Sequence, residues 1–515
     1  MPTVARRLQR LISVPPTLRI DSFKMKQPRG AAQHVLLFYP CAEGSLSLLT
    51  LPALHRTGER MAKKGKKTKP IPDNMLIIHP HAAGIDVGAE EHWVCVPADR
   101  DAQPVQKFSA FTCDLHRLAD WLTACRITTV VMESTGVYWI PLFQILEARG
   151  FEVALVNARH VKNVPGRPKT DRFDCRWLQK LHTYGLLAPS FRPPEDICQL
   201  RSLLRHRENL IRMTVKHIQH MQKSLDQMNL HLHHVISDIT GVTGMRIIRA
   251  IVAGERDPRT LAQYRDYRIK SSADTIAKAL EGDYRTEHVF TLTQSLALYD
   301  FTQQQIAACD QEIERVLATL DSQVDPDAHP LPPPTTTHRQ PQRNEPAFDL
   351  RTHLYRITGV DLTQVPGFQA PTIHIILAEV GLNMHKWPTD KHFASWLGLC
   401  PDNQISGGKV LATGSRRVQN RASRALRMAA QSLRTSPSYL GAFYRRMRSK
   451  LGPAKATTAT AHKLAKILYH MLKEKTSYRE RGAEYYPHRD QERKLKQLRK
   501  QATHLGFDLV PQASH

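Results

Sequence analysis

The sequence predicts a mixed α/β N-terminal domain, long coiled-coil helices and a mostly helical C-terminal domain. Short apolar runs alternate with amphipathic stretches over 76–190, apolar residues recur with a heptad period over 191–324, and helical periodicity returns over 350–487. The segment 325–349 is rich in Pro and Thr and nearly free of apolar residues, which is typical of a linker. A chain of 515 residues is long enough for several domains of this kind.

The composition indicates a polyanionic partner. Lys and Arg total 73 against 47 Asp and Glu, a formal charge of +26, and such a surplus favours nucleic acid through counterion release. A membrane surface is the competing partner for a basic chain. The most apolar early stretch, 35–54, is interrupted by Pro40, Glu43 and Pro52, so we predict neither a transmembrane segment nor a signal peptide.

The two ends and the cysteines complete this outline. Residues 1–75 form a basic, proline-containing extension that we expect to be disordered, and 488–515 form a basic tail. Met61 and Met75 are alternative starts.

The eight cysteines are scattered without a CxxC pair, which fits a reducing bacterial cytoplasm. The histidines around His231, His233 and His234 are better explained as a polar helix face than as a metal site.

The first region has the strand order of a ribonuclease H-like sheet. Apolar runs at 84–87, 92–97 and 105–111 precede a helix-like stretch at 114–125, and a run at 127–132, a helix at 138–149 and a run at 152–156 follow. Three strands followed by alternating helix and strand predict helices packed on a mixed sheet.

The heptads of the second region predict a coiled coil, either within one chain or between subunits. Arg207 and Thr214 interrupt the first seam, so we expect imperfect pairing there. The first seam comprises Ile197, Leu204, Ile211, Ile218, Leu225 and Leu232, supported by Leu200, Met221, Met228 and Val235, and the second comprises Leu292, Tyr299, Ile306, Ile313 and Leu320.

Two acidic residues occupy apolar strands, where an unpaired charge is costly. Asp86 lies within the first strand between Gly84 and Gly88, and Glu133 ends the fourth. The first and fourth strands are neighbours in a ribonuclease H-like sheet, so these carboxylates should meet. Phosphodiester cleavage by metal ions needs such converging oxygen ligands, with Mg²⁺ as the expected ion and Mn²⁺ as a substitute.

Asp171 and Asp174 begin a helical pattern and project from one face. Capping and helix-dipole stabilisation are the structural explanation for either residue alone. Together with Asp86 and Glu133, they complete a metal-binding quartet. Lys169 and Arg172, at the same helix start, are suited to phosphates.

The third region contains a second candidate site. The turn 365–367, with Gly367, resembles that of a helix-hairpin-helix, which offers backbone N–H groups to a phosphate. Downstream, Ser406 precedes two glycines in a polar loop, where a serine is usually a turn residue and no neighbour deprotonates it. An enzyme that exchanges DNA strands without ATP nevertheless needs a covalent phospho-enzyme to keep the energy of the broken bond. A serine hydroxyl on such a loop is suited to be the nucleophile that forms it. The basic residues near it, assigned to nucleic acid, are Lys409, Arg417, Arg421 and Arg424.

Several long strings extend this interpretation. Between residues 77 and 486 the chain contains, in this order, HPHAAGIDVGAEEHWVCVP, VVMESTGVYW, GRPKTDRFDCRWLQKL, LCPDNQISGGKVL, NRASRALRMAA and ATTATAHKLAKILYHMLK. They resemble the bridge-RNA-guided insertion-sequence transposases, which join an N-terminal RuvC-like DEDD domain to a C-terminal serine transposase domain.

The resemblance implies roles that the residues alone do not establish. Asp86, Glu133, Asp171 and Asp174 would hold Mg²⁺, and Ser406 would form a transient phosphoserine link to a cut DNA strand. A guide (bridge) RNA would pair with donor and target DNA, so specificity would lie in base pairing. Subunits would assemble as a dimer or tetramer through the coiled coil, and one subunit's DEDD site could complete another's serine site.

Two other functions fit the same residues. A metal-only nuclease, such as a RuvC-like DNA junction resolvase, would use the carboxylates and leave Ser406 structural. A non-catalytic nucleic-acid-binding scaffold would keep the fold and the basic surface, although the intact carboxylate quartet argues against it.

Overall fold

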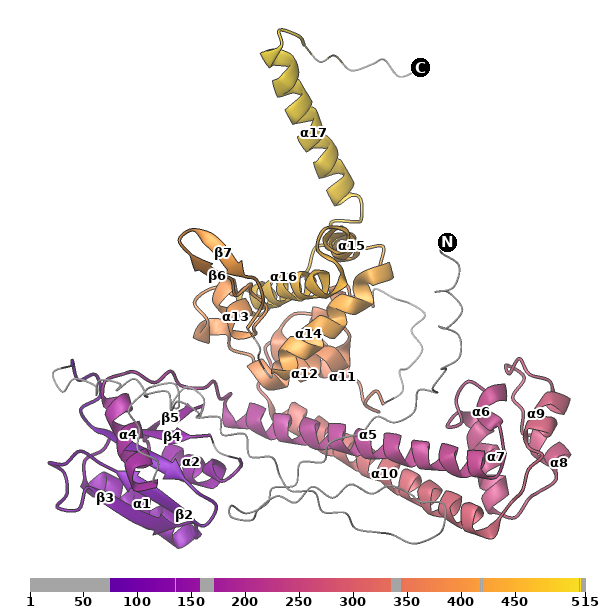
Figure 1. Ribbon diagram of the computed structural model, residues 1–515, viewed down its shortest axis with the longest axis horizontal. Helices are drawn as coiled ribbons and strands as arrows, with labels where there is room; N and C mark the ends of the chain where they lie inside the picture. The colour runs from indigo at the N-terminus through magenta and orange to yellow at the C-terminus, as the bar shows by residue number, and fades with distance from the viewer. Residues whose placement is uncertain are drawn as a thin grey trace, which may run out of the picture. The chain divides into compact units, whose positions relative to one another are not determined.

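The computed structural model describes residues 75–134, 136–157, 171–334, 344–416, 418, 420–508 and 510 (Figure 1). Nearly all of the predicted N-terminal extension lies outside the described residues. The same holds for Lys169, Arg417 and residues 335–343 of the predicted linker.

The N-terminal region folds as a five-stranded mixed sheet with the strand order β3-β2-β1-β4-β5. Strand β1 pairs antiparallel with β2 and parallel with β4. The predicted succession of three strands, helix, strand, helix and strand is confirmed, whereas the ribonuclease H-like assignment stays a prediction. The elements are β1 (Ala82–Val87), β2 (Glu91–Cys95), β3 (Val105–Ser109), α1 (Thr112–Ala124), β4 (Thr129–Glu133), α2 (Trp139–Ala148) and β5 (Glu152–Val156).

The two faces of the sheet carry different helices. Ile85 and Met132 point into an apolar cluster that includes buried side chains of α1 and α2. The opposite face is covered by α4 (Asp171–Thr183). A Cβ on Gly84 would lie 2.8 Å from the Cα of Gln179 and closer still to the α4 backbone. Only glycine therefore allows this approach of α4 to β1.

Two long helices, α5 (Glu195–Gln227) and α10 (Thr286–Thr319), pack against each other within the chain (Figure 1). The prediction that the first heptad helix continues through Leu232 is wrong. Helix α5 ends at Gln227, and Asn229 has a φ of 57°. A left-handed residue cannot continue an α-helix, so the chain turns there before a short helix, α6 (Leu232–Val235).

The residues that interrupt the first heptad seam are buried between these helices. Arg207 is 6% exposed and forms an ion pair with Asp310 of α10, with 3.0 Å between Nη2 and Oδ2. Its Nη1 also donates to the Asn344 carbonyl at 3.0 Å. The Thr214 hydroxyl donates to the Leu210 carbonyl of its own helix. Both polar interruptions are thus satisfied, as burial requires.

The chain between α5 and α10 forms its own apolar cluster. Ile247, Ile248 and Ile251 of α7 (Val242–Val252) are fully buried in it, beside Met221 and Leu225 of α5 and Leu292 of α10. Its remaining helices are α8 (Pro258–Ala262) and α9 (Ala273–Ala279).

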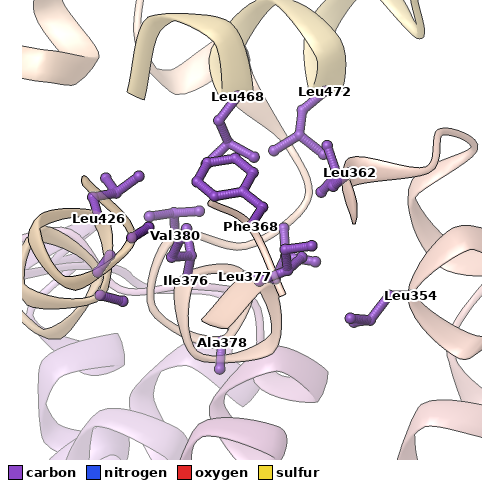
Figure 2. Close-up of a cluster of buried hydrophobic side chains, with 14 of the residues drawn as sticks. Leu354, Leu362, Phe368, Ile376, Leu377, Ala378, Val380, Leu426, Leu468 and Leu472 are labelled. Atoms are coloured by element: carbon purple, nitrogen blue, oxygen red, sulfur yellow. The ribbon is translucent and has the colours of Figure 1, made fainter. Parts of the chain in front are cut away.

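The C-terminal region is mostly helical, as predicted. Its apolar cluster includes Leu354, Phe368, Leu426 and Leu468 (Figure 2), together with buried residues of α5 and α10. The elements are α11 (Leu350–Thr358), η1 (Leu362–Gln364), α12 (Ala370–Val380), η2 (Met384–Lys386), α13 (Asp390–Trp396), β6 (Gln404–Ser406), β7 (Lys409–Ala412), α14 (Arg421–Ser432), η3 (Leu433–Thr435), α15 (Tyr439–Leu451) and α16 (Pro453–Glu474).

A last helix, α17 (Tyr485–His504), contributes Tyr485 and Tyr486 to the edge of that cluster. Nearly all of its described side chains beyond Tyr486 are exposed. Among the described residues, no helix is long and apolar enough to cross a membrane.

Candidate functional site

Asp86 and Glu133 lie beside each other on neighbouring strands. Strands β1 and β4 are parallel, with Ile85 opposite Met132, and each acidic residue is the next one along its strand. Side chains alternate between the faces of a strand, so both carboxylates point away from the Ile85–Met132 face and toward the face covered by α4. This is the arrangement expected of two ligands to one metal centre.

The Glu133 carboxylate lies at the largely buried end of β4. The residue is 6% exposed, and no described residue gives its carboxylate a hydrogen bond or an ion pair. A divalent cation would compensate the negative charge of this carboxylate. The hard oxygen of a carboxylate is also the donor that Mg²⁺ prefers, so the residue fits this ion.

Asp86 lies close to α4. The pKa of the Cys175 thiol on that helix is raised, first by its hydrogen bond with Cys95 and by burial, and further by the negative charge of Asp86. Asp171 and Asp174 occupy the first turn of the same helix, one turn before Cys175 and Leu178, which are buried. Asp171 is exposed and Asp174 is partly buried.

The structure does not gather all four carboxylates into one ligand set. In the part of the chain that it describes, no group of three or more His, Cys, Asp or Glu side chains is placed to hold a metal ion. Residues 158–170, which lead into α4, lie outside that part. The quartet therefore consists of one adjacent pair in the sheet and one pair at the start of the covering helix.

Ser406 is the last residue of β6 and not part of a loop, which corrects the prediction. It lies opposite Lys409 of β7, and Gly407 and Gly408 form the turn between them with φ values of 55° and 76°. Two consecutive residues with positive φ are typical of the tight turn that glycine favours. All residues of this hairpin are exposed, and no described residue forms a hydrogen bond with the Ser406 hydroxyl.

Two family models match this chain, one on each candidate site. Residues 83–230 match a DEDD model of the IS110 type, described as a transposase, and residues 361–445 match a model described as the transposase IS116/IS110/IS902 family. The protein is a DNA transposase. The matches support its place in the IS110 family, and they include Asp86, Glu133, Asp171, Asp174 and Ser406. No curated protein matches the chain.

The predicted nucleic-acid contacts of the transposase have unequal surroundings. Arg172, Lys409 and Arg424 are exposed. Arg421 instead forms an ion pair with Glu208 of α5, which holds α14 against that helix. Gly367 has a φ of 90°, and a Cβ there would lie 2.9 Å from the Ala429 carbonyl oxygen, so this glycine also has a packing role.

Sequence reasoning missed a residue that holds α4 on the sheet of the transposase. His182 is 5% exposed, its Nε2 lies 2.9 Å from the Thr129 hydroxyl of β4, and its ring stacks on His79 at 4.7 Å. Burial, and then the charge of His79, lower its pKa to about 4. The sequence did hold one signal for its burial. His182 follows Cys175 by seven residues, and positions seven apart share a helix face.

We expect this histidine to make the N-terminal domain acid-sensitive. The folded state favours neutral His182, so its contribution is complete above the ordinary pKa of 6.5 and is lost as the pH falls toward about 4. The loss is roughly 3 kcal/mol at most. Urea unfolding at pH 7 and at pH 5 should show a smaller pH effect in His182→Gln than in the wild type. An equal pH effect in the two proteins would contradict this role, and His116→Gln, at an exposed position of α1, is the matched control.

Proposed function

We propose that the transposase cleaves and exchanges DNA strands with two sets of residues, a metal-binding carboxylate set and a covalent serine. The observation that carries the proposal is the adjacent pair Asp86 and Glu133 on parallel strands, on the face that α4 covers. A nuclease centre needs such converging oxygen ligands, and the family matches on both halves of the chain supply the link to transposition.

The carboxylate set would hold Mg²⁺, with Mn²⁺ as a substitute. Glu133 and Asp86 would be the inner pair, and Asp174 and Asp171 would approach from α4. When bound, the ion neutralises charge on the phosphate oxygens. The protein's own part is positional: Gly84 allows α4 to lie close to β1, and the His182–Thr129 hydrogen bond keeps it there.

Ser406 would be the nucleophile for strand exchange. Its Oγ attacks the phosphorus of a DNA phosphodiester, the Oγ–P bond forms as the P–O3′ bond breaks, the serine proton is lost and the 3′ oxygen takes one up. The phosphoserine keeps the energy of the broken bond, so the 3′ hydroxyl of another strand can reverse the step without ATP. The exposed hairpin gives DNA direct access to the hydroxyl. Mapping a trapped protein–DNA adduct to Ser406 by mass spectrometry tests this step.

Sequence specificity would come from a guide RNA that pairs with donor and target DNA. The net charge of +26 suits a protein that holds several nucleic-acid strands by their backbones. The RNA would come from the non-coding end of the element itself.

We therefore expect the transposase, expressed with its flanking DNA, to co-purify with one discrete RNA that has loops complementary to the element end and the insertion site. Sequencing of the bound RNA checks this. Expression without the flanks is the control, and recovery of the same mixture of cellular RNA in both preparations would overturn RNA guidance.

A homo-oligomer, either a dimer or a tetramer, completes the proposal. The facing apolar sides of α5 and α10 are used within one chain. Large apolar side chains remain exposed on these helices, among them Met213, Val215 and Phe301, and these would form the contact between subunits.

A further inference from the structure

A basic pocket outside both candidate sites lies against α16. It is formed by one face of that helix, the first residue of α15 and the segment 476–481. The lining includes Tyr439, Lys463, Lys466, His470, Arg479 and Arg481.

Lys463 is held at this pocket by aromatic side chains. It is partly buried, and its Nζ donates to the hydroxyls of Tyr439 at 2.5 Å and Tyr486 at 2.8 Å. The same Nζ lies 4.1 Å from the ring centroid of Tyr439 and 4.2 Å from that of Phe443. These contacts fix the ammonium group in one position, but none of them supplies a negative charge.

The nearby carboxylates pair with groups other than Lys463, Arg479 and Arg481. Asp390 pairs with Lys466 at 2.9 Å and with His470 at 3.5 Å. Glu480 accepts from the Tyr439 backbone N–H at 2.7 Å and from the Tyr478 hydroxyl at 3.0 Å.

Three cations of the pocket therefore lack a counter-ion. Among the described residues, no ion pair includes Lys463, Arg479 or Arg481. Arg481 lies instead over the rings of Tyr439 and Tyr485. Of the three, Lys463 is partly buried; a partly desolvated cation without an anion is unfavourable, and a bound anion would remove that cost.

We propose that this pocket binds a phosphate group of a nucleic-acid strand. The inference rests on the transposase activity and not on the chemistry of Ser406. Tyr486, which contacts Lys463, is also the second residue of α17, and exposed basic residues such as Arg489 and Arg493 follow on that helix. A strand with one phosphate at Lys463 would meet further positive charge on α17, which favours a polymer over a free phosphate ion.

The test measures how the nucleic-acid affinity of the full-length transposase depends on salt concentration. The measurement is made in EDTA, which prevents cleavage. Failure of this inference is thereby distinguished from failure of the proposed chemistry. Fluorescence anisotropy would follow duplex DNA and single-stranded RNA in parallel. For Lys463→Met, the slope of log K against log salt should fall by about 0.9 with duplex DNA or about 0.7 with a single strand. Affinity at 0.1 M salt should fall roughly tenfold, and the nucleic acid that loses affinity is the one that occupies the pocket.

Two variants serve as controls. Lys473→Met removes another lysine of α16 that contacts a tyrosine ring, Tyr469, but lies outside the pocket lining, so it should keep the wild-type slope. Lys463→Arg keeps the charge and should keep most of the affinity. If Lys463→Met does not fold, the double variant Arg479→Gln/Arg481→Gln, at two exposed positions, should show the same loss. Wild-type slopes with both nucleic acids in a folded Lys463→Met or in the double variant would overturn the proposal.

Discussion

Replacing Ser406 with alanine is expected to abolish formation of joined DNA products while leaving DNA binding intact. The hydroxyl is the attacking group in the proposed covalent step, and removal of a nucleophile costs factors on the order of 10⁶ in rate. Ser406 is exposed at the end of β6, so the substitution should leave the melting temperature unchanged. Sequencing gels for cut and joined strands, together with a denaturing gel for the protein–DNA adduct, measure the effect.

Ser415 provides the matched control for this variant. It is an exposed serine at the base of the same hairpin, where it bridges to Pro401, and Ser415→Ala should retain both adduct and product. If Ser406→Ala still cuts DNA, leaves a free 5′ phosphate and forms intact products, the protein is a metal-only nuclease and the serine is structural.

Replacing Asp86 with asparagine should remove metal-dependent cleavage, by about 10³-fold or more. A catalytic metal contributes several kcal/mol to the transition state, and each 1.36 kcal/mol corresponds to about a factor of 10. Asparagine keeps the size of the side chain but removes the negative charge. Cleavage assays in Mg²⁺ measure the rate, and electron paramagnetic resonance of bound Mn²⁺ measures occupancy without reference to activity.

Asp120→Asn is the control for charge loss in the same domain, because Asp120 is an exposed residue of α1 that pairs with Arg149. It should keep cleavage and Mn²⁺ binding. A wild type that neither cleaves DNA nor binds Mn²⁺, with Asp86→Asn identical to it, would favour the non-catalytic scaffold.

The placement of the carboxylates was the most predictable part of the site. Asp86 and Glu133 stand in strands that the apolar runs reveal, and the predicted ribonuclease H-like arrangement makes those strands neighbours. Their common face follows from alternation along parallel strands, and the register of β1 with β4 agrees with it. Local pattern carries the strand positions and the alternation of faces, because both are properties of the chain itself, whereas the adjacency of the two strands came from the predicted sheet arrangement.

The heptad region was predicted less completely. The repeat located both long helices but placed the end of the first one too late, because Asn229 adopts a left-handed conformation that apolar spacing does not report. In the sequence, Arg207 only interrupted the apolar heptad positions. Its partner, Asp310, is far away in sequence, so the ion pair exists only once α5 and α10 pack together.

By itself, the sequence determined the order of strands and helices in the N-terminal region, the basic character, the strand positions of Asp86 and Glu133 and the glycine turn beside Ser406. Only the tertiary structure decided that α4 covers the carboxylate face and that His182 and Thr129 hold it there. The same is true of the pairing of Arg421 with Glu208 and of the contacts between Lys463 and the rings of Tyr439 and Phe443. The reason is physical. Periodicity and turn chemistry act between near neighbours in the chain, whereas burial, counter-ions and shifted pKa values depend on segments that only folding brings together.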